Sequence, residues 1–227
     1  MDMTTASAVD GGLPGPALLR LLTWLSPAFP TGGFAYSHGL EWAVEVGDVR
    51  DEGSLREWVE DVLTHGAGWS DAILLRHAWR APGAASLSAI ADLAAASAPS
   101  RERQQETLDQ GEAFLRAAAV WGEPPAEGRV AYPVAVGAVT ARHGIAEDAA
   151  CAGYLHAFAA NLVSAAVRLV PLGQSAGLRV LASLECCLLG VASATRGAGL
   201  DEVGGACFRD GIASMRHETQ YTRLFRT

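Results

Sequence analysis

The segment SLREWVEDVLTH, residues 54–65, carries the clearest structural signal in the chain. Its large apolar residues recur at spacings of three, four, seven and eight: Leu55, Trp58, Val59, Val62 and Leu63. This is the period of a helix that buries one face. Ser54 and Glu57 have the spacing of a capping box, which predicts that the helix begins at Ser54. The segment therefore favours a helical fold.

The same reading extends outward to the rest of the chain. The stretch ALLRLLTWL starts a first helix at Ala17 that Pro27 ends, and Gly32 and Gly33 open a second helix through about Val46. Further helices are predicted at about 69–80, 86–97, 101–121, 133–143, 147–169 and 175–195. No alternating strand pattern competes with them. We predict an all-α, single-domain bundle of about eight to ten helices over residues 17–215, after a disordered lead-in at 1–16.

Composition excludes several classes of function. The chain has 227 residues and a formal net charge of -8, with no basic run, so nucleic acid is not an expected partner. All 17 basic residues are arginine. A Walker loop needs a lysine to reach the phosphates, and Schiff-base catalysis needs a lysine amine. Both are excluded.

The four cysteines, Cys151, Cys186, Cys187 and Cys207, show no C-x-x-C spacing, and no secretory signal precedes them. We therefore expect a reduced, cytoplasmic protein. The longest weakly charged stretch, VLASLECCLLGVASAT at 180–195, is shorter than a bilayer span and predicts a core helix, not a membrane segment.

The stretch SPAFPTGGFAYSHGLE, residues 26–41, raises two chemical possibilities. The run AYSHG comes close to the G-x-S-x-G elbow of hydrolases, which would make Ser37 a nucleophile, but the elbow needs a preceding strand that the pattern lacks. A local hydrogen-bonding role for Ser37 is the favoured alternative.

His38, Glu41 and Glu45 are spaced so that one helix face would gather an imidazole and two carboxylates. Such donors suit Ni²⁺ or Zn²⁺. A polar helix stripe without metal is the favoured interpretation, and no confident metal site is predicted.

The C-terminal segment 216–227 mixes Arg216, Arg223 and Arg226 with aromatic and aliphatic side chains, a composition typical of interfaces. Fixing its backbone costs on the order of 12–24 kcal/mol. Burying Leu224 and Phe225 returns only ~1.5–3 kcal/mol each. We expect this segment to be loose in the isolated chain.

Three separated motifs resemble the UreF family of urease accessory proteins: LSPAFPTGGFAYSHGLEWAV at 25–44, RLVPLGQSAG at 168–177 and SMRHETQYTRLFR at 214–226. They occur in the same order, and the resemblance runs from about Leu18 to Arg226. It implies an all-helical, cytoplasmic homodimer without catalytic activity. Such a protein binds UreD, called UreH in some bacteria, and recruits the GTPase UreG. The complex docks on apo-urease and assists GTP-dependent nickel insertion, so nickel and GTP are handled by the complex and no cofactor is expected on this chain.

The resemblance also implies where partners bind. It suggests that the C-terminal segment becomes ordered on UreD, through Arg216, His217, Glu218, Gln220, Tyr221, Arg223, Leu224 and Phe225. Phe34, Tyr36, His38 and Glu41 are expected to line an interhelical docking surface. Two alternatives stay open at this point: an independent nickel metallochaperone using His38, and a Ser37 hydrolase.

Overall fold

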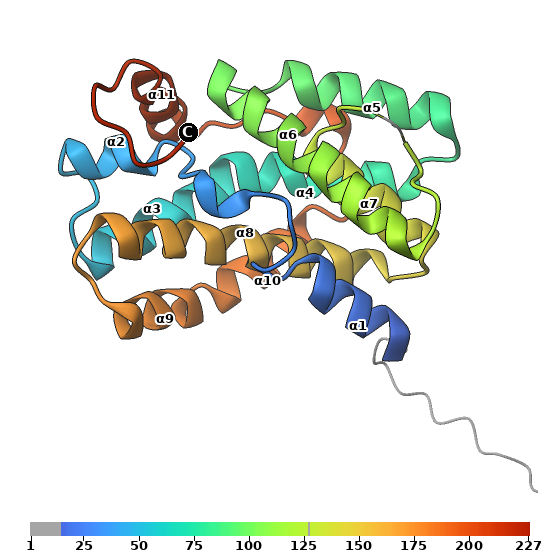
Figure 1. Cartoon of the computed structure of the whole chain (residues 1–227), viewed down its shortest axis with the longest axis horizontal. Helices are drawn as coiled ribbons and strands as arrows, with labels where there is room; N and C mark the ends of the chain where they lie inside the picture. Colours follow the sequence, from blue (N-terminus) through green and yellow to red (C-terminus); the bar gives the residue numbers. More distant parts are fainter. Residues whose placement is uncertain (1–14, 127) are drawn as a thin grey trace, which may run out of the picture.

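The computed structural model describes residues 15–126 and 128–227, and within them the chain is all-α (Figure 1). No strand occurs in this part of the chain, so the predicted fold class is confirmed. The α-helices are α1 (Gly15–Trp24), α2 (Leu40–Glu45), α3 (Glu52–His65), α4 (Ala67–Arg80), α5 (Ala84–Ala96), α6 (Arg101–Ala118), α7 (Tyr132–Arg142), α8 (Glu147–Leu169), α9 (Gln174–Ser183), α10 (Glu185–Ala194) and α11 (Phe208–His217), with 3-10 turns η1 (Gly33–Ala35), η2 (Ala119–Trp121) and η3 (Leu200–Glu202).

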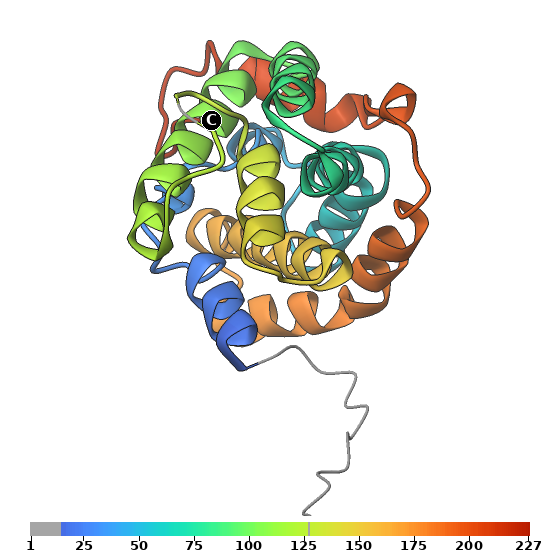
Figure 2. The ribbon, with the colours of Figure 1, turned by 90° about the vertical axis from the view of Figure 1, so that its right-hand side faces the viewer.

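Helix α8 is the centre of the bundle. It contacts α2, α3, α4, α7, α9 and α10, and the two views in Figures 1 and 2 show these helices arranged around it. Its buried face includes Cys151, Tyr154, Leu155, Phe158 and Leu162, as the sequence pattern predicts. One continuous apolar core runs through all the major helices. This core fixes the body on which the C-terminal residues lie.

Helix α3 begins two residues earlier than predicted. Its N-cap is Asp51, whose carboxylate accepts a hydrogen bond from the backbone N–H of Ser54 at 2.8 Å. The Ser54 hydroxyl in turn accepts from the N–H of Asp51 at 3.1 Å. A capping box is therefore present, but Ser54 occupies its third helical position and Glu57 takes no part.

The predicted helix from Gly33 through Val46 is wrong in its first half. Only the short turn η1 forms there, and α2 starts at Leu40. His38 has φ of 55° and Gly39 has φ of 76°, a left-handed conformation that breaks a right-handed helix. A Cβ on Gly39 would lie 2.6 Å from the backbone N of Ser214. The bend thus lets the chain pass close against α11.

The predicted helix at 175–195 is two helices, α9 and α10, that meet at Leu184. By length and composition alone, α8 and the span Gln174–Ala194 are both long and apolar enough to cross a membrane. Helix α8 is instead the core helix of this bundle. The α9–α10 span is less buried than the prediction of a core helix implies, because Leu178, Cys186 and Leu189 are exposed.

The lead-in predicted for residues 1–16 lies mostly outside the described residues. Gly15 and Pro16 already belong to α1, so the helix begins two residues before Ala17.

Candidate functional site

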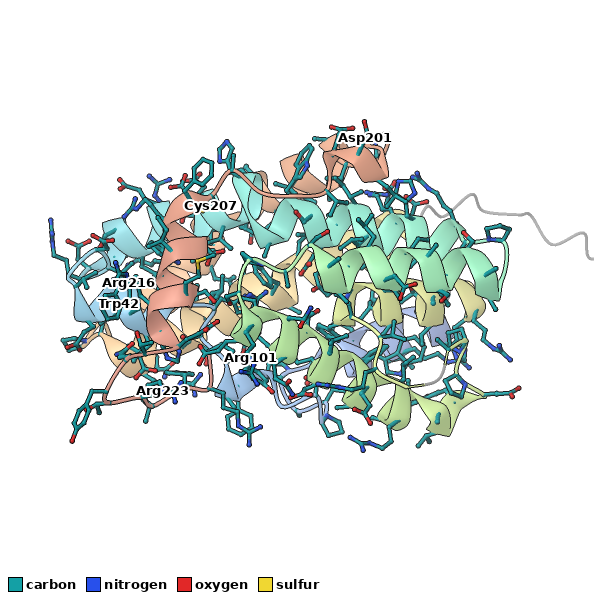
Figure 3. All side chains as sticks on the ribbon, turned by 90° about the horizontal axis from the view of Figure 1, so that it is seen from above. Trp42, Arg101, Asp201, Cys207, Arg216 and Arg223 are labelled. Carbon is teal, nitrogen blue, oxygen red and sulfur yellow. The ribbon has the colours of Figure 1, made fainter. Side chains whose placement is uncertain are left out.

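Helix α11 buries three polar side chains and exposes three large apolar ones, beside the exposed Arg209 and Arg216. Asp210, Ala213, Ser214 and His217 are buried against the body, where α11 packs on α2 and α6. Three large apolar side chains point outward: Phe208, Ile212 and Met215, which are 75%, 56% and 54% exposed. Figure 3 shows α11 running from Cys207 to Arg216. The end of the helix at Arg216 lies beside Trp42 of α2. A surface helix normally has the opposite arrangement.

The residues after α11, 218–227, form what we call the tail, and Glu41 of α2 holds its middle. The backbone N–H of Leu224 donates to Glu41 Oε1 at 2.6 Å, and that of Phe225 donates to Oε2 at 2.9 Å. Nε2 of His217 lies 3.1 Å from the same Oε2. Glu41 is buried, so these hydrogen bonds replace the water that its carboxylate loses.

Glu102 of α6 forms a second attachment. Its Oε2 is 2.7 Å from Nδ1 of His217, and its Oε1 accepts from Arg223 at 2.7 Å. The neighbouring backbone N–H of Arg101 donates to the carboxylate of Glu218 at 3.0 Å. Figure 3 shows Arg101 and Arg223 on the side of the molecule where the tail returns to the body.

The end of the tail attaches to residues 35–37 and to α6. The N–H of Arg226 donates to the Ala35 carbonyl at 2.8 Å, and the N–H of Ser37 donates to the Thr227 carbonyl at 2.8 Å. The Thr227 hydroxyl donates to Glu106 at 2.7 Å. The Phe225 ring is buried beneath the guanidinium of Arg168, whose central carbon is 4.4 Å from the ring centroid.

The expectation of a loose C-terminal segment is therefore wrong for the chain alone. The apolar burial of Leu224 and Phe225 is too small to order the segment, and Leu224 is in fact exposed. The segment also donates hydrogen bonds to buried Glu41 and Glu106. Hydrogen bonds to charged groups contribute about 1.5–3 kcal/mol each, so several of them offset much of the ordering cost.

A buried charged cluster lies below the tail. Nε2 of His38 is 2.8 Å from Glu106 Oε1, and Arg103 pairs with the other oxygen of Glu106. Burial would raise the pKa of Glu106, but Arg103 and His38 together lower it to about 2. Burial, followed by the charge of Arg103, lowers the pKa of His38, against the opposing effect of Glu106. Burial also raises the pKa values of Asp71 and Asp210 to about 6.

The cluster borders a cavity of about 220 Å³ between α6, α7 and α8. His38, Arg103 and Glu106 lie on its polar side, and Phe158 and Tyr132 on its aromatic side. Among the described residues, Nδ1 of His38 and Nε of Arg103 have no hydrogen-bond partner. The cavity is polar enough to hold water.

The structure does not assemble the predicted metal ligands. His38 precedes α2, so it does not share a helix face with Glu41 and Glu45. Both oxygens of Glu41 accept hydrogen bonds from the tail, and Glu45 is exposed. Within residues 15–126 and 128–227, no group of three His, Cys, Asp or Glu side chains could hold a metal ion. Glu41 is a tail anchor.

The structure also contradicts the nucleophile interpretation of Ser37. Its hydroxyl is buried and donates to the Thr227 carbonyl, and it accepts from the N–H of Glu41 at 3.3 Å. The described part of the chain has no strand from which an elbow could form. The favoured alternative, a local hydrogen-bonding role, holds for the bond from Glu41, whereas the bond to Thr227 joins residues 190 apart in the sequence.

The predicted partner-binding residues divide into two groups. Tyr36, His38, Glu41, His217 and Phe225 are buried and hold the tail or the bend beneath it. The others are exposed, except for the half-buried Gln220: Phe34, Arg216, Glu218, Tyr221, Arg223 and Leu224.

The outer face of α11 was not predicted from the sequence. Phe208, Ile212 and Met215 have helical spacing, which was a usable signal. Glycines at 204, 205 and 211 lower the helical propensity of this segment and weaken that signal.

Comparisons with known proteins agree with one another. The family model described as UreF matches residues 49–185. The chain is 52% identical to the urease accessory protein UreF of Bradyrhizobium sp. (strain BTAi1 / ATCC BAA-1182), over 97% of this chain and 96% of that protein. It is 50% identical to the UreF of Rhodopseudomonas palustris (strain BisA53), over 100% and 99% of the two chains. The UreF of Methylobacterium sp. (strain 4-46) is 53% identical, over 92% and 88%.

Proposed function

The chain belongs to the UreF family of urease accessory proteins, and we propose that it serves urease maturation as a non-catalytic scaffold. In this proposal it binds UreD (UreH), recruits the GTPase UreG, and docks with them on apo-urease for GTP-dependent nickel insertion. Nickel is the cargo of the complex. We further propose that the protein works as a homodimer in the cytoplasm.

The observation that carries this proposal is the docking face, which we define as Phe208, Ile212 and Met215 of α11 with Tyr221 and Leu224 of the tail. All five side chains are exposed, and Phe208, Ile212 and Met215 share one side of α11. Large apolar side chains that gather on an exposed surface are a mark of protein–protein interaction sites. We assign this face to UreD, and the ordered tail gives it a preformed shape that lowers the entropic cost of binding.

The division of labour with a GTPase follows from the composition. Because the chain has no lysine, it lacks the residue that a Walker loop uses to reach the nucleotide phosphates. GTP hydrolysis is therefore assigned to UreG.

Co-purification with tagged UreD tests the proposal. The double variant Ile212→Ser, Met215→Ser should keep its helical content and lose at least about tenfold in affinity for UreD, because it removes two central apolar contacts. The control is Val120→Ser, which removes an exposed apolar side chain next to the C-terminus of α6, outside the docking face. Equal recovery of UreD with both variants would remove the docking face from the proposal.

A further inference from the structure

An open groove lies on the surface between α6 and the tail. One part of it, about 530 Å³ in volume, is bordered by Arg101 at the start of α6 (Figure 3). The other part, about 420 Å³ in volume, is bordered by Arg116 near the end of that helix. Tyr36 and Arg226 border both parts, so the two are continuous. Because Arg101 and Arg116 are 15 positions apart on one helix, the groove follows α6 for about 22 Å.

The groove presents three arginine side chains that form no ion pair. Most arginines of this acidic chain pair with carboxylates, as Arg56 does with Glu60 at 2.8 Å. Arg101, Arg116 and Arg226 make no such pair with any residue that the structure describes, and all three are exposed. Three positive charges therefore face the solvent along the groove without a carboxylate of this chain to neutralise them.

Four carboxylates also border the groove, and each lies against a donor of this chain: Glu102, Asp109, Glu112 and Glu218. Glu102 accepts from Arg223 at 2.7 Å. Asp109 pairs with Arg129, which also lies 3.9 Å from Glu112. Glu218 accepts a backbone N–H at the start of α6 at 3.0 Å. The acidic side chains are thus engaged, and the three arginines are the groups left to bind a ligand.

The arrangement of charge favours a peptide over a nucleic acid. A nucleic-acid strand carries a phosphate at every nucleotide, so it would bring negative charge against the carboxylates of the groove. A peptide can place its carboxylates opposite the arginines alone. An extended strand rises about 3.3 Å per residue, so the groove accommodates about seven residues. The ring of Phe34, 68% exposed, borders the part of the groove near Arg116 and offers an apolar contact.

We propose that this groove binds an extended acidic segment, about seven residues long, of a partner protein. Carboxylates of the segment pair with Arg101, Arg116 and Arg226, whose planar guanidinium groups suit two-point contacts with carboxylates. An apolar side chain of the segment covers Phe34. None of the docking-face residues borders the groove, so this second surface goes beyond the proposed function and does not depend on UreD.

Fluorescence anisotropy of a labelled peptide tests the groove on the full chain without any partner. The probe is a seven-residue peptide rich in glutamate, and the control peptide has glutamine at the same positions. The acidic peptide should bind, and its affinity should fall as salt screens the arginines. The triple variant Arg101→Gln, Arg116→Gln, Arg226→Gln should bind it about tenfold more weakly, because exposed ion pairs are individually weak and three are lost.

Matched variants make the result decisive. Arg50→Gln removes an exposed arginine just before α3, away from the groove, and should bind the acidic peptide like the unmodified chain. Arg116→Gln alone leaves the tail untouched and should still weaken binding about twofold, so it serves if the triple variant fails to fold. Equal affinity for the two peptides would overturn the proposal, as would unchanged binding in the triple variant.

Two further measurements separate the other occupants. A single-stranded oligonucleotide that displaced the acidic peptide at lower concentration would assign the groove to nucleic acid and overturn the proposal. Sedimentation of the triple variant should show the same oligomeric state as the unmodified chain. A smaller assembly would identify a second copy of this chain as the occupant, which would also overturn it.

Discussion

The carboxylate of Glu41 accepts the backbone N–H of Leu224 at 2.6 Å, although 183 residues separate the two in sequence. Phe225 and His217 bond to the same carboxylate, so one side chain of the short helix α2 makes three of the contacts that hold residues 217–225 on the body. Tyr221 and Leu224, whose exposed side chains belong to the proposed docking face, lie on the segment that this contact holds. In the proposed function, partner recognition on the outside depends on this buried anchor.

Replacing Glu41 with glutamine tests the anchor. The amide keeps the size of the side chain but loses its charge and one acceptor oxygen, so at least one tail amide is left without its partner. We expect the free energy of unfolding to fall by about 1–3 kcal/mol, measured by urea titration. Glu45→Gln, an exposed substitution on the same helix, should change it by no more than about 0.5 kcal/mol. Equal stability of the two variants would show that Glu41 is not an anchor.

Gly137 and Gly190 both lie within helices and provide a second pair of matched substitutions. A Cβ on Gly137 of α7 would lie 2.2 Å from the Leu75 carbonyl oxygen of α4, whereas a Cβ on Gly190 of α10 meets nothing within 4 Å. Gly137→Ala should therefore force α4 and α7 apart and destabilise the fold by about 2 kcal/mol or more. Gly190→Ala should stabilise it by up to about 1 kcal/mol, because alanine is the better helix former. Thermal unfolding followed by circular dichroism measures both, and a destabilised Gly190→Ala would contradict the packing described.

The sequence predicts the helices of this protein well where one local pattern decides the outcome. The buried face of α8 follows from its periodicity, and the first residues of α6 and α8 agree with the predicted starts at 101 and 147. The predicted second helix was wrong because the contact that prevents it comes from a residue far away in the sequence. Gly39 takes a left-handed conformation to admit the backbone of Ser214, and no local signal reveals that contact.

The sequence pointed to some residues near the tail but not to their places in the structure. Tyr36, His38 and Glu41 were expected on a docking surface, yet they are buried. Their partners come from the tail and from α6, so their burial depends on contacts that periodicity does not encode. The exposed apolar side of α11 has the spacing of a helix, but spacing alone does not say which side faces inward.

Asp210 should make stability fall as the pH rises from about 4 to 6. Burial, against the charge of Arg103, raises the pKa of Asp210 from its usual 3.8 to about 6, so the folded chain binds a proton that the unfolded chain has released. Stability is full below the unfolded value and declines through the folded value, by ~3 kcal/mol from this group. Asp210→Asn should remove that decline and raise stability at pH 7. The measurement is urea unfolding at pH 4, 5, 6 and 7, compared with the unmodified chain. An unchanged slope in the variant would exclude Asp210 as its source.

Deleting residues 218–227 should leave the helical body folded and abolish the proposed docking of UreD. The deletion removes Tyr221 and Leu224 from the docking face and takes the two tail N–H donors from Glu41, but His217 stays on α11 and keeps its contact with that carboxylate. The apolar core should keep its helices, since among its members only Phe225 is lost. We therefore expect nearly unchanged far-ultraviolet circular dichroism, a lower melting temperature, and no co-purification with UreD. The matched control is Thr222→Ala, an exposed change within the tail, which should bind UreD normally. Retained UreD binding by the truncated chain would place the interface elsewhere on the body.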